Sequence, residues 1–189
     1  MQIIVGMCGA SGIIYGLRFL EVSKEIGIRT HLVLTEGCKR LIGLETEYSI
    51  EDIKSLASVT YEIDDMFAPI ASGSFKTDGM VVIPCSMKTL AGIACGYSEN
   101  LLLRAADVTI KEGRPLILVT RESPLSPIHL ENMLKLARIG VYILPASPSF
   151  YGRPKTIQDL VNTVVGRVLD ILKVEHKVYK RWGEEYEFD

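Results

Sequence analysis

Short apolar runs alternate with longer amphipathic segments along the whole chain. The first run, residues 3–7, is continuously apolar and ends in a glycine-rich turn, as is typical of a strand buried on both faces of a parallel sheet. In the longer segments, apolar residues recur every three or four positions, which indicates helices. The pattern predicts strands at 3–7, 28–34, 59–61, 80–83, 116–119 and 141–144, and helices at 17–26, 35–44, 50–57, 87–95, 100–111, 126–138 and 156–172.

Strands that alternate with helices in this way predict an α/β fold with a parallel sheet and right-handed crossovers. No internal repeat, low-complexity segment or linker interrupts the alternation, so residues 1–189 are expected to form a single domain. The charged tail, residues 173–189, is expected to leave the core and to pack on a neighbouring subunit. Its aromatic side chains, which would make that contact, are Tyr179, Trp182, Tyr186 and Phe188.

Composition narrows the class of protein. Of the 189 residues, 48% are hydrophobic and 23% are charged, which is close to the globular average and argues against long disorder. The formal net charge is −2, whereas a nucleic-acid-binding protein carries a basic surplus. No apolar run approaches the ~18 residues that a membrane-spanning helix needs, and the N-terminus lacks the basic region of a signal peptide. We therefore expect a cytoplasmic protein that binds neither nucleic acid nor membrane.

The cysteines and histidines give no sign of a metal site. The four cysteines, Cys8, Cys38, Cys85 and Cys95, form no C-x-x-C pair and lie in apolar or glycine-rich stretches. This setting predicts buried free thiols rather than disulfides or zinc ligands. The three histidines are scattered along the sequence, so we expect no bound metal.

The turn after the first predicted strand has the composition of a phosphate-binding loop. Gly6, Gly9 and Gly12 follow one another at intervals of three, between a buried strand and a helix, where backbone N–H groups and the helix N-terminus can hold an anion. The spacing differs from the dinucleotide G-x-G-x-x-G, and the second strand ends at Thr35 rather than at an acidic residue. A mononucleotide is favoured over NAD. Alternatively, the glycines only permit a tight turn.

Two further turns have similar chemistry. The segment Ser86-Met87-Lys88-Thr89 follows the fourth strand, and Thr120-Arg121-Glu122-Ser123 follows the fifth. Because the carboxyl ends of parallel strands meet at one edge of a sheet, where such sheets bind ligands, the three turns together predict a phosphorylated ligand.

Cations elsewhere suggest a second anion site. Arg104 and Lys111 are seven positions apart and so share one face of a helix. Arg167 lies among aliphatic residues on a core-like helix and needs a partner there. That partner is either a carboxylate, such as Asp170 or Glu122, or a phosphate.

These residues, taken in order, resemble the flavin prenyltransferases of the UbiX/Pad type almost from end to end. Any one of the shared motifs is a modest signal, but their order and spacing together are specific. Phe150-Tyr151 and Arg167 accompany them. The matching segments are 9–12 (GASG), 45–47 (ETE), 69–74 (PIASGS), 84–90 (PCSMKTL), 104–108 (RAADV), 111–116 (KEGRPL), 121–124 (RESP), 129–133 (HLENM) and 181–184 (RWGE).

The resemblance implies a Rossmann-like or flavodoxin-like three-layer sandwich with a mostly parallel central sheet. It implies a homo-oligomer, commonly a dodecamer, that binds reduced FMN and dimethylallyl monophosphate, or in some members the diphosphate. The dimethylallyl group is joined to N5 and C6 of the flavin without a metal. The prenylated FMN then serves a UbiD-type decarboxylase.

The family's residue roles carry over by position. Glu45 matches a carboxylate that assists the flavin chemistry. Arg104, Lys111 and Glu122 match a catalytic polar cluster around the prenyl phosphate, and Tyr151 and Arg167 match positions that hold this phosphate. We expect Glu122, or the released phosphate beside it, to take the proton that leaves the flavin ring. The segment 87–88 departs from the family pattern. The FMN-binding positions are Gly9, Ala10, Ser11, Thr35, Ser86, Met87, Lys88, Thr89 and Arg121.

Two alternatives stay open at this point. An FMN-dependent cysteine decarboxylase shares the fold and the flavin, but its Pro-x-Met-Asn segment is absent from this sequence. A non-catalytic FMN-binding protein would have no need for Arg104, Lys111, Tyr151 and Arg167 at a second phosphate site.

Overall fold

The computed structural model describes residues 1–183, and within them a single six-stranded sheet runs in the order β3-β2-β1-β4-β5-β6. Every pair of neighbouring strands in it is parallel, which confirms the predicted α/β fold. Tyr186 and Phe188 of the predicted tail lie outside the described residues. The strands are β1 (Gln2–Met7), β2 (Arg29–Leu34), β3 (Val59–Tyr61), β4 (Gly79–Cys85), β5 (Leu116–Thr120) and β6 (Tyr142–Pro145).

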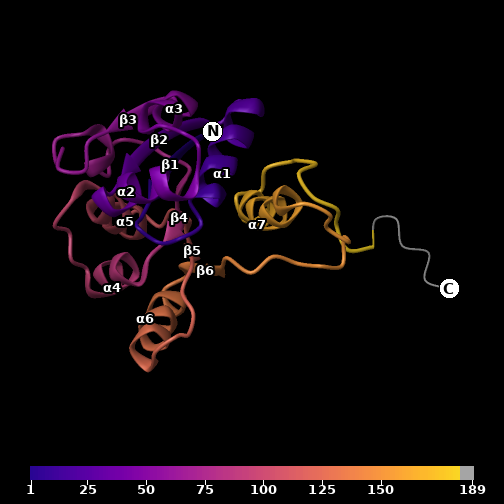
Figure 1. Ribbon diagram of the computed structural model, residues 1–189. Coiled ribbons are helices and arrows are strands. Elements are labelled where there is room, and N and C mark those ends of the chain that lie inside the picture. Colours follow the sequence, from indigo (N-terminus) through magenta and orange to yellow (C-terminus); the bar gives the residue numbers. More distant parts are fainter. Residues whose placement is uncertain (184–189) are drawn as a thin grey trace.

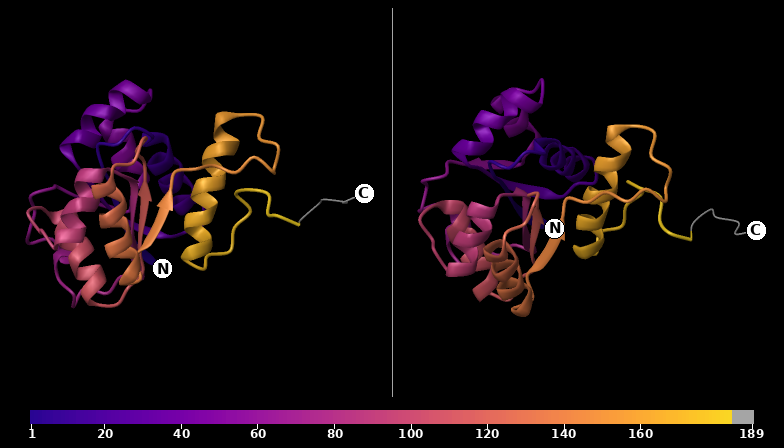
Figure 2. Two further views of the ribbon diagram at one scale, coloured as in Figure 1. Left: turned by 90° about the horizontal axis from the view of Figure 1, so that it is seen from below. Right: turned by 60° about the horizontal axis from the view of Figure 1, so that its bottom comes forward.

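Helices cover both faces of the sheet (Figures 1 and 2). Side chains of α1, α2, α3 and α7 share one apolar cluster with the sheet, and those of α4, α5 and α6 share the other. The described helices are α1 (Ile13–Glu25), α2 (Glu36–Glu45), α3 (Ile50–Leu56), α4 (Met87–Cys95), α5 (Leu101–Lys111), α6 (Pro127–Arg138) and α7 (Ile157–Ile171), with a short 3₁₀ helix, η1 (Pro69–Ala71).

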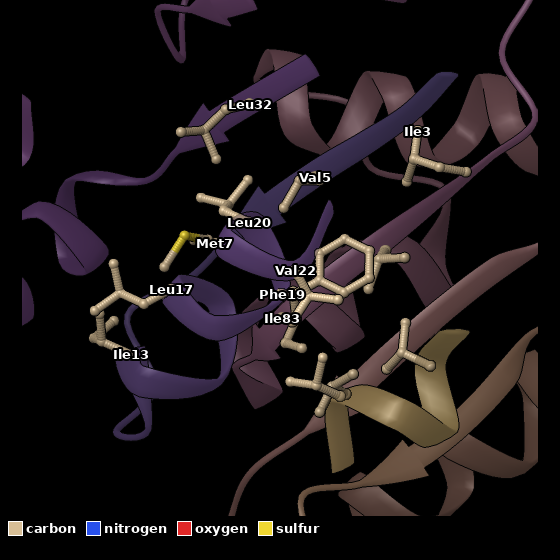
Figure 3. Close-up of a cluster of buried hydrophobic side chains, with 14 of the residues drawn as sticks. Ile3, Val5, Met7, Ile13, Leu17, Phe19, Leu20, Val22, Leu32 and Ile83 are labelled. Atoms are coloured by element: carbon tan, nitrogen blue, oxygen red, sulfur yellow. The ribbon is translucent and has the colours of Figure 1, made fainter. Parts of the chain in front are cut away.

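The strands supply the core to both faces by simple alternation. Ile3, Val5 and Met7 of β1 point into the cluster under α1 and α7, part of which Figure 3 shows, whereas Ile4 and Cys8 belong to the opposite cluster. The central strands β1, β4 and β5 are buried on both faces, so they carry almost continuous apolar runs instead of the alternating pattern of a half-exposed sheet. This explains why they were recognisable in the sequence.

Two element boundaries differ from the prediction by more than one residue. The sequence predicts that β4 stops before Pro84, but the strand continues through Pro84 to Cys85, where the pairing with β5 becomes irregular. Helix α1 begins at Ile13, four residues before the predicted start. The N-cap position before it is Gly12, whose backbone is left-handed (φ 105°) and which has no side chain of its own to cap the helix.

Helix α1 lies so close to the sheet that Gly16 leaves no room for a methyl group. A Cβ at Gly16 would be 2.5 Å from the carbonyl oxygen of Ile83 and from the Met7 methyl. We expect Gly16→Ala to lower the free energy of unfolding by about 1–3 kcal/mol, a typical cost of overpacking. Gly43→Ala in α2 is the control, because its Cβ meets nothing within 4 Å. It should stabilise by roughly 0.5–1 kcal/mol. Urea unfolding of both variants tests this, and equal effects would contradict it.

The cysteines are all free, and Cys8, Cys38 and Cys85 are buried as predicted. The prediction is wrong for Cys95, which is exposed because it ends α4 at the surface. Among the described residues, no helix is both long and apolar enough to cross a membrane.

The segment between β6 and α7 extends away from the sheet, and the chain after α7 runs back along this helix (Figures 1 and 2). In the described part of the tail, Tyr179 and Arg181 hydrogen-bond to Asp170 of the same chain. The tail therefore packs on its own α7 up to the end of the described residues.

Candidate active site

The turns that follow β1, β4 and β5 lie side by side at the carboxyl edge of the sheet. The backbone N–H of Cys8 donates to the carbonyl of Pro84 at 3.2 Å, and that of Arg121 donates to the carbonyl of Cys85, also at 3.2 Å. The N–H of Thr35 donates to the carbonyl of Met7 at 3.0 Å. One edge of the sheet thus gathers the predicted flavin-binding segments.

A carboxylate of the same chain already occupies the N-terminus of α1. Oε2 of Glu45, the last residue of α2, accepts the N–H groups of Gly12 at 2.8 Å and Ile13 at 2.9 Å. Burial by itself raises the pKa of this carboxyl, but the two backbone hydrogen bonds outweigh it and lower the pKa below its usual range. The nearby Ser11 hydroxyl and Arg121 guanidinium lower it further. The first glycine turn is therefore held by an internal anion.

Two of the hydroxyls that the sequence assigns to flavin binding, those of Thr35 and Ser86, also cap helices. Thr35 Oγ1 accepts the N–H of Cys38 at the start of α2, and Ser86 Oγ accepts the N–H of Thr89 at the start of α4. In α4 the N–H groups of Met87 and Lys88 find no acceptor among the described residues. Helix N-termini favour anions. Glu45 already occupies the N-terminus of α1, so a phosphate fits the N-terminus of α4 instead.

Gly37, which the sequence analysis did not single out, supports the first turn. A Cβ at Gly9 would lie 2.9 Å from Cα of Gly37, and one at Gly37 would lie 3.1 Å from Cα of Gly9. The first turn and the start of α2 are thus in direct backbone contact. The only sequence signal was a glycine in the first turn of a predicted helix, a position that does not require one.

Glu122 lies at the same edge, directly after Arg121. It is exposed, and its Oε1 accepts the N–H of Ser123 at 2.9 Å. An exposed carboxylate beside the sheet edge can accept a proton and pass it to solvent.

Tyr151 and Arg167 line one cavity of about 520 Å³ between the β6–α7 segment, α7 and the tail. The Tyr151 ring meets that of Trp182 edge to face, with centroids 5.2 Å apart. Arg167 Nη1 donates to Oδ2 of Asp170 at 2.9 Å, so one of the two carboxylates considered from the sequence is its partner in this chain. The Arg167 side chain is 58% exposed and still available to a ligand in the cavity.

Arg104 and Lys111 lie elsewhere. Arg104 donates from Nε to the carbonyl of Ala71 at 3.1 Å and from Nη1 to Asp107 at 2.9 Å. Lys111 Nζ donates to Glu112 at 2.9 Å, at the C-terminus of α5. Helix α5 covers the sheet face opposite to α7. One chain therefore does not bring these two cations to Tyr151 and Arg167.

The described residues contain no group of three or more His, Cys, Asp or Glu side chains that could hold a metal ion.

The chain is similar to known proteins at two levels, a broad class and a family within that class. Residues 1–169 match the Flavoprotein family. A probable UbiX-like flavin prenyltransferase from Escherichia coli O157:H7 is 53% identical over 183 residues, which are 96% of this chain and 93% of that protein. The chain is thus a flavoprotein. Within that class, it belongs to the UbiX-like flavin prenyltransferases, which confirms the family predicted from the sequence.

Solved structures agree with this assignment. A dodecameric FMN-dependent UbiX-like decarboxylase from Escherichia coli O157:H7 has a TM-score of 0.95 and 53% identity, over 96% of this chain and 99% of that one. AnUbiX (PadA1), in complex with FMN and dimethylallyl pyrophosphate, has a TM-score of 0.95 and 44% identity, over 96% and 97%. The peptidyl-cysteine decarboxylase EpiD, at 15% identity and a TM-score of 0.63 over 91% and 98%, shares the fold alone.

Proposed function

We propose that this chain is a flavin prenyltransferase that joins the dimethylallyl group of dimethylallyl phosphate to N5 and C6 of reduced FMN. The observation that carries the proposal is that the chain offers two separate places whose groups favour an anion. One is the N-terminus of α4, and the other is the cavity with Tyr151 and Arg167. A reaction between two phosphate-bearing molecules needs one site for each, whereas a flavin store needs only the first.

The fit of FMN to the first site follows from the groups at the sheet edge. The N–H groups of Met87 and Lys88, with the hydroxyls of Ser86 and Thr89, would hold the FMN phosphate. The flavin ring would lie along the other predicted positions at this edge. In reduced form, FMN supplies the nucleophilic nitrogen N5. The remaining predicted flavin-binding positions are Gly9, Ala10, Ser11, Thr35 and Arg121.

The second site would bind the prenyl phosphate and stabilise it as a leaving group. Breaking the allylic C–O bond leaves the electron pair on phosphate oxygen, and Arg167 and Tyr151 would stabilise that charge with hydrogen bonds. The bond from N5 to the allylic carbon releases the N5 proton. The bond from C6 to the far alkene carbon then forms as the alkene takes up one proton and C6 loses one. Glu122, exposed at the sheet edge, would accept the proton that C6 loses, either directly or through the released phosphate. Glu45 would hold the first turn in place through Gly12 and Ile13.

Arg104 and Lys111 can join this site only from another copy of the chain, because α5 and α7 lie on opposite faces of the sheet. We therefore include a homo-oligomer in the proposal. The likeness to a dodecameric relative supports twelve subunits. We further propose a cytoplasmic location and a UbiD-type decarboxylase as the consumer of the prenylated FMN.

The test is anaerobic incubation of the protein with reduced FMN and dimethylallyl monophosphate. The flavin should gain the mass of one dimethylallyl group less one hydrogen and lose the spectrum of FMN. The competing function is direct decarboxylation, which the names of two similar structures state, one of them for phenylacrylic acid. Release of carbon dioxide from phenylacrylic acid by the FMN-loaded protein, with the flavin mass unchanged, would favour the decarboxylase and contradict the proposal.

A further inference from the structure

Asp170 of α7 is the centre of a polar cluster at the edge of the Tyr151 cavity. Its Oδ2 accepts hydrogen bonds from Arg167 at 2.9 Å and from the Tyr179 hydroxyl at 2.7 Å. Its Oδ1 accepts from Arg181 at 2.7 Å and lies 3.1 Å from Nε2 of His176. The Asp170 side chain is only 14% exposed, so one nearly buried carboxylate fixes two guanidinium groups.

Burial by itself raises the pKa of the Asp170 carboxyl, but the hydrogen bonds that it accepts, first among them the one from Arg181, lower it to about 2. It is ionised at neutral pH and balances one of the two guanidinium charges. Its two oxygens are therefore fixed acceptors for both guanidinium groups.

Both guanidiniums line the cavity. Arg167 comes from α7 and Arg181 from the tail, and they share the cavity wall with Tyr151 and Trp182. The ring of Tyr179 lies beneath the Arg181 guanidinium, 5.5 Å from its central carbon, and restrains it further. The tail is therefore part of the cavity wall rather than an appendage.

We propose that Arg181 is a second phosphate-binding residue of the prenyl phosphate site, and that Asp170 is the positioning residue that holds it beside Arg167. The inference rests on the proposed function. Two planar guanidiniums held by one carboxylate present several N–H groups in fixed directions, which suits the oxygens of a monophosphate or a diphosphate. A single arginine on a helix would bind the phosphate with fewer restraints.

The first variant to test is Arg181→Gln in FMN-loaded protein. Its half-saturating concentration of dimethylallyl monophosphate should rise about tenfold or more, with the FMN content unchanged. Trp182 is the single tryptophan of the chain and lies in this cavity, so its fluorescence reports binding of the monophosphate or of inorganic pyrophosphate without turnover. Arg181→Lys keeps the charge but loses the planar fork and should weaken binding less. Asp170→Asn should weaken binding as well, because it releases both guanidiniums.

Arg153→Gln is the matched control. It removes the same charge from the same region, but Arg153 lines the neighbouring cavity and not this one. Its half-saturating concentration should change less than about threefold. If Arg181→Gln and Arg153→Gln raised the half-saturating concentration equally, the inference would be overturned. If Arg181→Gln does not fold, Arg181→Lys is compared with Arg153→Gln in its place. Ligand-dependent fluorescence without any prenylated flavin in the unmodified protein would instead overturn the proposed function alone.

Discussion

Gly9→Ala is expected to weaken FMN binding roughly fivefold to a hundredfold. The new Cβ would lie 2.9 Å from Cα and 3.0 Å from the carbonyl carbon of Gly37, both backbone atoms that cannot rotate away. Either the first turn or the start of α2 must move. Overpacking of this kind costs about 1–3 kcal/mol, and the displaced segment is the one proposed to face the flavin. The measurement is the dissociation constant of FMN, from flavin fluorescence on titration into apoprotein.

Gly37→Ala tests whether the effect comes from backbone crowding or from direct contact with the flavin. Its Cβ would lie 3.1 Å from Cα of Gly9, on the α2 side of the first turn. It should weaken FMN binding in the same direction but by less. Gly43→Ala, at the far end of the same helix with nothing within 4 Å of its Cβ, should leave FMN binding unchanged. Unchanged FMN affinity in Gly9→Ala would show that this contact does not shape the flavin site.

The fold could be predicted because both faces of the sheet are covered. A strand buried on both faces is apolar at nearly every position, so β1 and β5 stand out as almost continuous runs. The start of α1 could not be predicted in the same way. It depends on Gly12 and on a carboxylate from the end of α2, thirty-three positions away, which no local pattern reveals.

The meeting of the predicted turns at one sheet edge could be foreseen from the sequence, but the placement of the predicted cations relative to one another could not. The glycine- and hydroxyl-rich turns after β1 and β4 are local patterns, and the order of parallel strands brings their ends together. The helical spacing of Arg104 and Lys111 is also local. Which face of the sheet their helix covers depends on the handedness of each crossover and on the strand order, so their separation from Arg167 appeared only in three dimensions.

That separation leads to a prediction about mixed oligomers. Lys111→Ala and Arg167→Ala, purified separately, should each lose about tenfold to more than a hundredfold of prenylation activity, because in the proposed site each would remove a charge-assisted hydrogen bond to the phosphate. If Lys111 of one copy completes the site of another, an oligomer that contains both variants has some sites with both cations intact. With random assembly in equal amounts, about a quarter of the sites should be complete.

The experiment is co-expression of the two variants with different affinity tags, tandem purification of oligomers that carry both tags, and measurement of prenylated FMN. The control pair is Tyr151→Phe with Arg167→Ala. These two residues line the cavity of one chain, so no assembly restores both to one site and the mixture should stay as weak as its parents. Mixed Lys111 and Arg167 oligomers that are no more active than the separate variants would exclude a shared site. Recovery in the Lys111 mixture alone would place α5 of one subunit against the Tyr151 cavity of the next.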